Sequence, residues 1–259
     1  MSDFTTERAG QVLIFTLNRP EKLNALSPEM QQGLVDALEQ EHREPSARAL
    51  LIRAAGRGFC VGADVAPEKI LARRKTIRAS MEGGINRVIT LIRDLPIPVV
   101  TAVNGPAAGA GVSLALSGDI VLAAHSAEFH LAFVRIGAVL DGGLSYFLNQ
   151  ALGPAKAAKL AMLGETLDAE QAERLGVVSE RIADEHLQAE AMALAERLAN
   201  GPTRSLAMIK QELQRGATSS LAEALSFEAE CQGKAFLNED FEEGILAFRD
   251  KRKAHFQGR

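Results

Sequence analysis

Two glycine-rich segments are the parts of this chain best suited to do chemistry. The first, GRGFCVGAD, runs from Gly56 to Asp64 after the apolar run 49–52, and the second, NGPAAGAG, runs from Asn104 to Gly111 after the apolar run 98–103. Glycine lets the backbone turn sharply and lets a ligand approach the main chain closely. The stretch 112–116 predicts a buried helix, and amides at a helix start have no partner within the helix. Two such turns brought together would point two N–H groups at one oxygen, which predicts an oxyanion hole; the alternative is a pair of tight turns without a ligand.

A single carboxylate, that of Asp141, ends an apolar run over 136–140 and precedes two glycines. An aspartate just before a helix, here predicted over 144–152, is a common N-cap. An apolar surrounding would instead raise the pKa of the carboxyl group and suit it to proton transfer. The residues alone leave these two interpretations open.

The second glycine segment also contains two patterns that belong to other classes of protein. Gly111 to Ala115 (GVSLA) imitates a serine-nucleophile elbow of the GxSxG kind, and a hydrolase would complete it with Asp141 and either His186 or His255. Such a serine sits at the tip of a strand, whereas Ser113 lies ten residues beyond Val103 and inside the predicted helix, so a helix-packing role is favoured. A dinucleotide fingerprint is disfavoured because Leu114 stands in place of its third glycine.

The composition is typical of a globular protein. The chain has 259 residues, of which 47% are hydrophobic and 24% charged, enough for one large domain or for a core domain with an appendage. A net charge of -4 indicates no nucleic-acid partner, and no apolar run has the length of a membrane span. Cys60 and Cys231 predict free thiols in a reducing compartment, so we expect a cytoplasmic protein. His125 and His130 lack a third ligand nearby, so we expect no metal site.

The elements that must position these residues follow from periodicity and turn signals. We expect strands over 11–17, 49–52, 97–103 and 119–123, and a helix that begins after a capping serine, Ser27. The stretch 66–94 begins polar and basic, and we expect it to be mobile. Helices are expected over 185–199, 202–215, 218–232 and 238–253. The pattern predicts an α/β core, residues 1–200, followed by a helical region, residues 201–259, that packs against another subunit.

Taken together, these segments resemble the enoyl-CoA hydratase/isomerase (crotonase) family over nearly the whole chain. The matching stretches are 17–26 (LNRPEKLNAL), 58–64, 102–111, 118–120 (GDI), 243–248 (EGILAF) and 251–253 (KRK). The resemblance implies a spiral of ββα units whose C-terminal helices drive the formation of homotrimers, often paired into hexamers. It also implies an acyl-CoA thioester as the substrate, with CoA as a part of that substrate and no other cofactor.

The resemblance assigns binding roles to particular positions. The backbone N–H groups of Val61 and Ala110 would hold the thioester oxygen. Three further groups of residues would contact CoA. Lys22, Asn24, Ala25 and Leu26 would contact it from an N-terminal segment, and Ala63, Asp64 and Val65 would lie beside the adenine. Phe248 and Lys251 would come from a neighbouring subunit.

Departures from the family pattern indicate the reaction. Where family hydratases carry two glutamates that hold and activate water, this chain has Ser113 and Phe133, so the usual hydration is not expected. Asp141 stands where several family isomerases place their single acid/base carboxylate. The chain is most similar to the isomerase branch that turns ring-epoxide CoA thioesters of phenylacetate breakdown into oxepins. A dehalogenase branch also uses an aspartate there, but with a histidine and a tryptophan; here Asn86 lies near the histidine position and tryptophan is absent.

We therefore expect an acyl-CoA isomerase in which Asp141 moves a proton and the oxyanion hole stabilises the enolate. Phe133 and Phe147 are expected to form an apolar wall, and the 66–94 stretch to shape the acyl pocket. One alternative is an enoyl-CoA hydratase that uses Asp141 in a non-standard way. The other is an inert acyl-CoA-binding relative, whereas an acidic pI of about 5.8 argues against an RNA-binding one.

Overall fold

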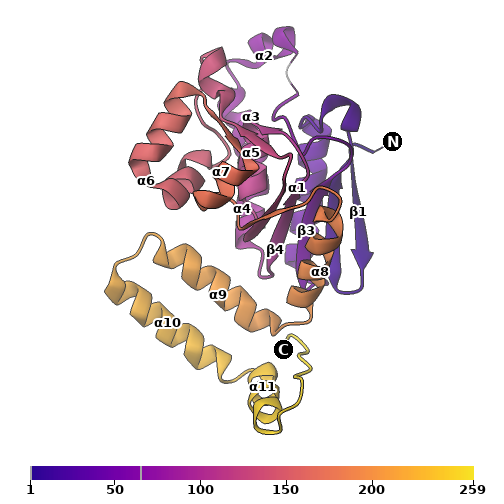
Figure 1. Cartoon of the computed structure of the whole chain (residues 1–259), viewed down its shortest axis with the longest axis vertical. Helices are drawn as coiled ribbons and strands as arrows, with labels where there is room; N and C mark the ends of the chain where they lie inside the picture. Colours follow the sequence, from indigo (N-terminus) through magenta and orange to yellow (C-terminus); the bar gives the residue numbers. More distant parts are fainter. Residues whose placement is uncertain (1, 65) are drawn as a thin grey trace.

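The centre of the molecule is a mixed β-sheet surrounded by helices (Figure 1). The computed structural model describes residues 2–64 and 66–259. Among these residues, six strands form the main sheet in the order β1-β2-β3-β4-β6-β9. The β1 strand pairs antiparallel with β2, and the other neighbours pair in parallel. The strands are β1 (Phe4–Ala9), β2 (Val12–Leu17), β3 (Ala49–Ala54), β4 (Val99–Val103), β6 (Ile120–Ala124) and β9 (Glu180–Ile182).

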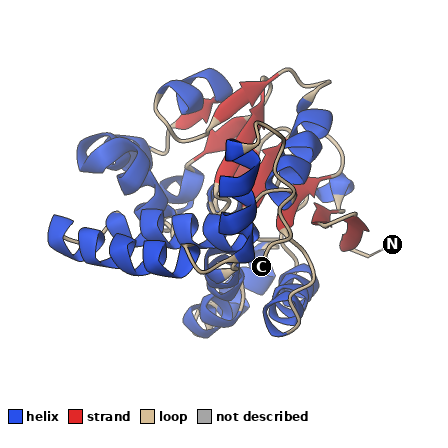
Figure 2. Cartoon of the chain, turned by 90° about the horizontal axis from the view of Figure 1, so that it is seen from below, coloured by secondary structure: helices blue, strands red, loops and turns tan. Residues whose placement is uncertain are grey.

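The apolar runs of the sequence become the buried middle of this sheet. All five residues of β4 are buried, as are five of the six in β2 and in β3. Parallel strands that are covered on both faces carry such near-continuous apolar runs. The helix α8 (Leu187–Ala199) packs on β2, β3, β4 and β6 through small buried residues, among them Ala191 and Ala195. Figure 2 shows helices lying around much of the sheet.

The N-terminal helices agree with the turn signals, with one difference. Helix α1 (Pro28–Arg43) begins after Ser27, whose hydroxyl accepts a hydrogen bond from the Met30 amide at 3.0 Å. The stretch 66–94 forms three helices, α2 (Pro67–Arg73), α3 (Ile77–Gly83) and α4 (Ile85–Asp94). The last of these is amphipathic, and its apolar face belongs to the core. The packing of residues 85–94 into the core argues against the expected mobility of that part, and the mobility of the rest stays a prediction.

A second, smaller sheet carries the second glycine segment. It consists of β5 (Ala107–Ala108), β7 (Glu128–His130) and β8 (Thr166–Asp168). Helix α5 (Ala110–Leu116) starts immediately after β5 and is buried along its whole length. Helix α6 (Leu144–Leu163) is longer than the predicted 144–152, because the helix resumes beyond a break at Gly153, which has φ 70° and precedes Pro154. The short helices η1 (Pro20–Lys22), η2 (Ala132–Ile136) and α7 (Ala169–Arg174) complete the core.

Three helices follow the core, as the sequence predicts. They are α9 (Thr203–Gly216), α10 (Leu221–Ala235) and α11 (Glu239–Arg249). Figure 1 places them at the lower end of the molecule, with α9 and α10 side by side. The division into units of residues 1–200 and 201–259 stays a prediction.

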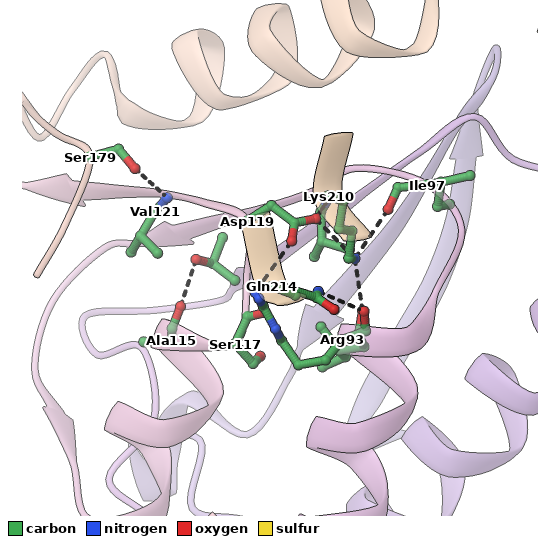
Figure 3. A network of polar contacts seen from close by, with 12 residues as sticks. Arg93, Ile97, Ala115, Ser117, Asp119, Val121, Ser179, Lys210 and Gln214 are labelled. Atoms are coloured by element: carbon green, nitrogen blue, oxygen red, sulfur yellow. Dashed lines mark hydrogen bonds and ion pairs between the residues drawn. The ribbon is translucent and has the colours of Figure 1, made fainter. Parts of the chain in front are cut away.

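A buried ion pair fastens α9 to the core (Figure 3). The Lys210 ammonium lies 2.9 Å from a carboxylate oxygen of Asp119, and it donates to the carbonyls of Ile92 and Ile97. Asp119 also accepts from the Val99 amide at 2.9 Å and pairs with Arg93 at 3.3 Å. The aspartate of the GDI motif is thus a junction between β4, α4 and α9.

Candidate active site

The two glycine segments lie side by side, as the oxyanion-hole hypothesis requires. The Ala108 amide donates to the Cys60 carbonyl at 2.9 Å, and the Phe59 amide donates to the Pro106 carbonyl at 3.0 Å. The approach is so close that a Cβ added to Gly111 would lie 1.9 Å from the Cys60 carbonyl oxygen. Only glycine fits there, because such a distance is far below van der Waals contact. The glycines therefore serve to bring two backbone segments together.

The Ala110 amide lies at the start of α5, beside the first glycine segment. Ala110 is the first residue of α5, and Gly109 precedes it as N-cap with φ 54°, a left-handed conformation that suits glycine. A Cβ added to Gly62 would lie 3.4 Å from the Ala110 nitrogen, so this nitrogen lies close to the first glycine segment. Amides at a helix start carry partial positive charge and lack a partner in the helix.

The Val61 amide differs from the expectation of a free donor. Its N–H donates to the Leu23 carbonyl oxygen at 3.1 Å. Leu23 has φ 48°, and the next residue, Asn24, has φ 56°, so a left-handed pair of residues carries this carbonyl to the amide. A thioester oxygen would have to share or replace the Leu23 carbonyl in order to use both amides.

The segment 22–26 borders the first glycine segment, but its side chains do not all face a ligand. The Leu26 amide donates to the Gly62 carbonyl at 2.7 Å, and Leu26 forms an isolated parallel bridge with Ala63. Ala25 and Leu26 are buried, whereas Lys22, Ala63 and Asp64 are not. Val65 lies outside the described residues.

Asn24 is a structural residue in this fold. Its side chain is fully buried, donates to the carbonyls of Ala55 and Gly58, and accepts from the Arg19 amide at 2.7 Å. The Asn24 side chain is therefore occupied within its own chain, where it shapes the left-handed turn, and a CoA contact at this position, which stays a prediction, would have to come from the backbone. Arg19, which the sequence analysis did not single out, pairs with Asp64 at 3.0 Å and donates to the Ala25 carbonyl at 2.8 Å.

Asp141 does not cap α6. The N-cap is Gly143, with φ 80°, and the Asp141 carbonyl, rather than its carboxylate, accepts from the Leu144 amide at 3.0 Å. Within the described part of the chain, the buried oxygen Oδ1 of Asp141 has no hydrogen-bond partner. Burial raises the pKa of the Asp141 carboxyl group from 3.8 to about 6. Of the two interpretations left open by the sequence, the N-cap is wrong, and an unpaired carboxyl group of raised pKa is what an acid/base residue needs.

Ser113 has no access to a substrate. It is fully buried within α5, and its Oγ donates to the backbone carbonyl of Asp141 at 2.8 Å. A hydrolase nucleophile must be exposed at a turn, so the elbow interpretation fails. His186 and His255, the two histidines considered for a triad, are exposed.

Two phenylalanines stand at the two halves of the site. A Cβ on Gly109 would lie 3.7 Å from the Phe133 ring, and one on Gly143 would lie 3.5 Å from the Phe147 ring. Phe133 thus borders the oxyanion segment, and Phe147 borders the turn that carries Asp141. Ile85, at the start of α4, also contacts this turn, with its Cγ1 3.2 Å from a Cβ position on Gly142.

Phe248 and Lys251 lie away from this site in the single chain. Phe248 is 86% exposed near the end of α11, and Lys251 is exposed just beyond it. Figure 1 shows α11 at the lower end of the molecule and α2, which follows the first glycine segment, at the upper end. A role for these two residues in CoA binding therefore needs a second copy of the chain.

A separate hollow lies between β1 and α1. Its volume is about 630 Å³, and none of the residues that line it belongs to the glycine segments. Its buried carboxylate, Glu41, accepts hydrogen bonds from Ser46, Ala47 and Arg8, which hold the pKa of Glu41 below its usual value against the opposing effect of burial. These groups satisfy one another, so the hollow is a weaker candidate than the glycine segments.

Two other kinds of site find no support in the described residues. Within residues 2–64 and 66–259, no three His, Cys, Asp or Glu side chains are grouped as metal ligands would be. Over the same residues, no helix combines the length and the apolar character that a membrane crossing requires.

The paired glycine loops and the sheet that carries them define an α/β fold of the crotonase type, and the comparisons agree. The model of the enoyl-CoA hydratase/isomerase family matches residues 7–259, so the chain belongs to that family. Its solved relatives include a putative enoyl-CoA hydratase/isomerase from Mycobacterium abscessus, with a TM-score of 0.92 and 35% identity over 99% of this chain and 100% of that one. A putative enoyl-CoA hydratase from Streptomyces coelicolor A3(2) matches with a TM-score of 0.93 and 36% identity over 99% and 94% of the two chains. The predicted family and fold class are confirmed.

Two curated relatives carry different activities in their names. The chain is 41% identical over 250 residues to 1,2-epoxyphenylacetyl-CoA isomerase of Escherichia coli K12, covering 96% of this chain and 95% of the relative. It is 38% identical over 246 residues to a probable enoyl-CoA hydratase of Rhodobacter capsulatus, covering 95% and 94%. Membership of the family is thus shown, while isomerase and hydratase activities both occur in the names of its relatives.

Proposed function

We propose that this protein is an acyl-CoA isomerase with Asp141 as its acid/base residue. The observation that carries the proposal is a carboxyl group of raised pKa, unpaired at Oδ1, on a turn that α5 supports. The same helix presents the Ala110 amide at its start. The 41% identity to a 1,2-epoxyphenylacetyl-CoA isomerase supports the isomerase over other activities of the family.

The reaction moves one proton along the acyl chain. With a 3-enoyl-CoA, the Asp141 carboxylate would take a proton from C2, and the electron pair would shift toward the thioester oxygen to form a dienolate. The Ala110 amide would stabilise that oxygen, and the Val61 amide would do so once its hydrogen bond to the Leu23 carbonyl is broken. One such donor generally stabilises the transition state by about 2.7–4 kcal/mol. The Asp141 acid would return the proton to C4, which gives the 2-enoyl-CoA. No water is added, so a second carboxylate is not required.

The surroundings of Asp141 fit a reaction that excludes water. Phe133 is 9% exposed and Phe147 is half-buried, and their rings lie against Gly109 and Gly143. We infer that these rings, together with Ile85, form the wall of the pocket around the acyl group. CoA would run along Lys22 to Leu26 toward Ala63 and Asp64.

The proposal is tested by following deuterium from solvent. Purified protein is incubated in deuterated water with a 3-enoyl-CoA and, separately, a 2-enoyl-CoA, and the products are analysed by mass spectrometry. We expect double-bond migration or carbon-bound deuterium, and an Asp141→Asn rate lower by about 10²–10⁴. An Asp141→Asn rate within about threefold of wild type would remove Asp141 from the mechanism. The ring-epoxide thioester is the third substrate to assay.

The second candidate is an enoyl-CoA hydratase. It is favoured by the hydratase name of the relative that shares 38% identity. In the same experiment a product of 2-enoyl-CoA heavier by one water would support the hydratase and refute the isomerase. Binding of CoA thioesters without any exchange would indicate an inert binder instead.

We further propose that copies of the chain assemble into a homotrimer, or a hexamer of two trimers, through the C-terminal helices. Large apolar side chains of this region are exposed in the single chain, in particular Leu213 (72%), Leu221 (76%), Leu237 (87%) and Phe248 (86%). Apolar surface gathered in one region marks a contact with a partner. Light scattering should give three or six times the mass of 27.7 kDa, and Leu237→Glu should reduce it. A monomeric wild type would refute the proposal.

A further inference from the structure

Ser113 makes one contact that its helix does not need. Buried residues within a helix find their backbone partners along that helix, and a serine there commonly bonds to a carbonyl one turn back. The Oγ of Ser113 instead donates out of α5, at 2.8 Å, to the backbone carbonyl of Asp141, 28 positions further along the chain. The side chain is fully buried. A hydrogen bond of this kind links the helix to the turn that bears the acid/base residue.

The turn itself has little stiffness of its own. It consists of Asp141 and two glycines, Gly142 with φ 54° and Gly143 with φ 80°. Glycine has the widest choice of backbone conformations, so it orders a turn less than any other residue does. The turn also lies directly against the serine, because a Cβ on Gly142 would be 2.7 Å from the Ser113 Cβ. Within the described part of the chain, the Ser113 hydroxyl therefore makes the side-chain hydrogen bond that ties this turn to α5.

The other half of the site is mounted on the same helical turn. Ala110 opens α5, and Ser113 follows three positions later, so the two residues are neighbours along one face of the helix. The oxyanion amide and the anchor of Asp141 thus share one rigid support. Their relative position does not depend on any flexible segment.

We propose that Ser113 is a positioning residue that holds the Asp141 carboxyl group at a fixed place relative to the Ala110 amide. The inference rests on the proposed function, since it assumes that Asp141 is the acid/base residue. Ser113 touches no substrate and acts only through the Asp141 backbone.

Loss of this anchor has a predictable effect on the carboxyl group. If the turn loosened, Asp141 would become accessible to water. Its carboxylate would also accept hydrogen bonds from the first free amides of α6, as the side chain of an N-cap residue does. Both changes favour the ionised form, so both lower the pKa of Asp141 from about 6 toward its ordinary value. A merely structural serine would lower stability without moving this pKa.

The chain supplies a matched control in Ser117. Like Ser113, Ser117 is fully buried, and its Oγ donates to a backbone carbonyl, that of Leu114, at 2.7 Å. It differs in that the bond stays within three residues at the end of α5. Ser113→Ala and Ser117→Ala therefore each delete one buried hydroxyl from the same region, and unfolding midpoints of both variants show whether they fold.

The first readout is steady-state kinetics of isomerisation across pH. For Ser113→Ala we expect kcat to fall by about 10- to 100-fold, as small misplacements of catalytic groups cause, with KM changed by less than about twofold. The acid limb of the rate profile should move to lower pH. Ser117→Ala should leave kcat and the limb unchanged. A Ser113→Ala enzyme with wild-type kcat and the same acid limb would overturn the inference.

The second readout needs no activity, so it separates failure of the inference from failure of the proposed function. Amide hydrogen exchange by mass spectrometry follows the peptide 138–148 in wild type and both variants. Faster exchange there in Ser113→Ala alone would support the anchor, even if the wild type proved inactive on every thioester. Equal exchange in all three proteins would contradict it, whatever the activity.

Discussion

At the scale of single residues, the backbone and the side chain of Asp141 have different roles. The Asp141 backbone carbonyl accepts hydrogen bonds from the Ser113 hydroxyl and from the Leu144 amide at the start of α6. These structural hydrogen bonds do not involve the carboxyl group. That division keeps Oδ1 buried and unpaired. An unpaired buried polar atom costs stability, and such costs concentrate at functional sites.

The raised pKa of Asp141 predicts the pH dependence of the reaction. The base must be ionised to accept a proton, and its carboxyl group titrates at about 6. The rate at low substrate should therefore be constant at neutral pH and fall tenfold per pH unit below about 6. Stopped assays from pH 4.5 to 8 would measure this limb. A limb at the ordinary aspartate value near 4 would mean that the carboxyl group is solvated.

The same shift predicts a gain of stability on removing the charge. Because the folded-state pKa is raised above the unfolded value, the ionised carboxyl group opposes folding, and this cost builds up as the pH rises from about 4 to about 6. Asp141→Asn should therefore be more stable than wild type at pH 8. The difference should shrink as the pH falls through this window, which urea unfolding at pH 8 and pH 4 would measure. Equal stability at both pH values would contradict the prediction.

At the scale of elements, the oxyanion site depends on how closely the two glycine segments approach. The Cys60 carbonyl takes the Ala108 amide, and Gly111 lies against that carbonyl. The Cys60 thiol shares this packing, and burial raises its pKa to about 12, so it stays protonated. The cysteine is a small core residue here rather than a nucleophile.

Gly111→Ala should disrupt the site more than the fold. The new Cβ would meet the Cys60 carbonyl at 1.9 Å, so α5 must shift and carry the Ala110 amide with it. Overpacking of this kind costs about 1–3 kcal/mol of stability, and we expect kcat to fall by about 10²-fold or more.

The control for this substitution is Gly233→Ala in α10, where a Cβ would meet nothing within 4 Å. Alanine in a helix interior is about 0.5–1 kcal/mol better than glycine, so this variant should be slightly more stable and fully active. Chemical denaturation and the isomerase assay measure both effects. Full activity of Gly111→Ala would show that the amides tolerate displacement.

At the scale of the whole molecule, α9 meets the core through several polar contacts, among them those of the buried Lys210 and the hydrogen bond from Gln214 to the Arg93 carbonyl. Lys210 is 7% exposed, and burial lowers the pKa of its ammonium group while Asp119 opposes that shift. The carbonyls of Ile92 and Ile97 accept its remaining protons (Figure 3). Removal of Lys210 would leave the carbonyls of Ile92 and Ile97 without this donor, while Asp119 would keep Arg93 as a charged partner.

Lys210→Met should therefore destabilise the protein by about 1–3 kcal/mol, the cost of leaving buried polar groups unsatisfied. The control is Lys159→Met, because Lys159 is 68% exposed and lies 3.6 Å from Glu165; loss of this exposed pair should cost less than about 1 kcal/mol. Urea unfolding at equal protein concentrations compares the two variants. Equal losses would show that Lys210 does not link α9 to the core.

The sequence by itself determined the central strands of the main sheet, the first long helix, the C-terminal helices and the identity of the family. Apolar runs became β2, β3, β4 and β6, and the segments separated by glycine beyond residue 185 became α8 to α11, because burial periodicity and turn residues act within a few positions. The β1 strand was not predicted, since four of its six residues are exposed and polar and carry no apolar signal. The glycine segments were singled out by their place after predicted strands, and Asp141 by its apolar run and by the family resemblance.

Only the tertiary structure decided which group each atom meets. The Leu23 carbonyl accepts a hydrogen bond from the Val61 amide 38 positions away, and the Asn24 side chain donates to backbone carbonyls of its own chain. The Ser113 hydroxyl donates to the backbone of Asp141. No local pattern encodes such partners, because they depend on how distant loops approach one another. The free or occupied state of an amide and the burial of a carboxyl group are properties of that approach, and they decide the chemistry of the site.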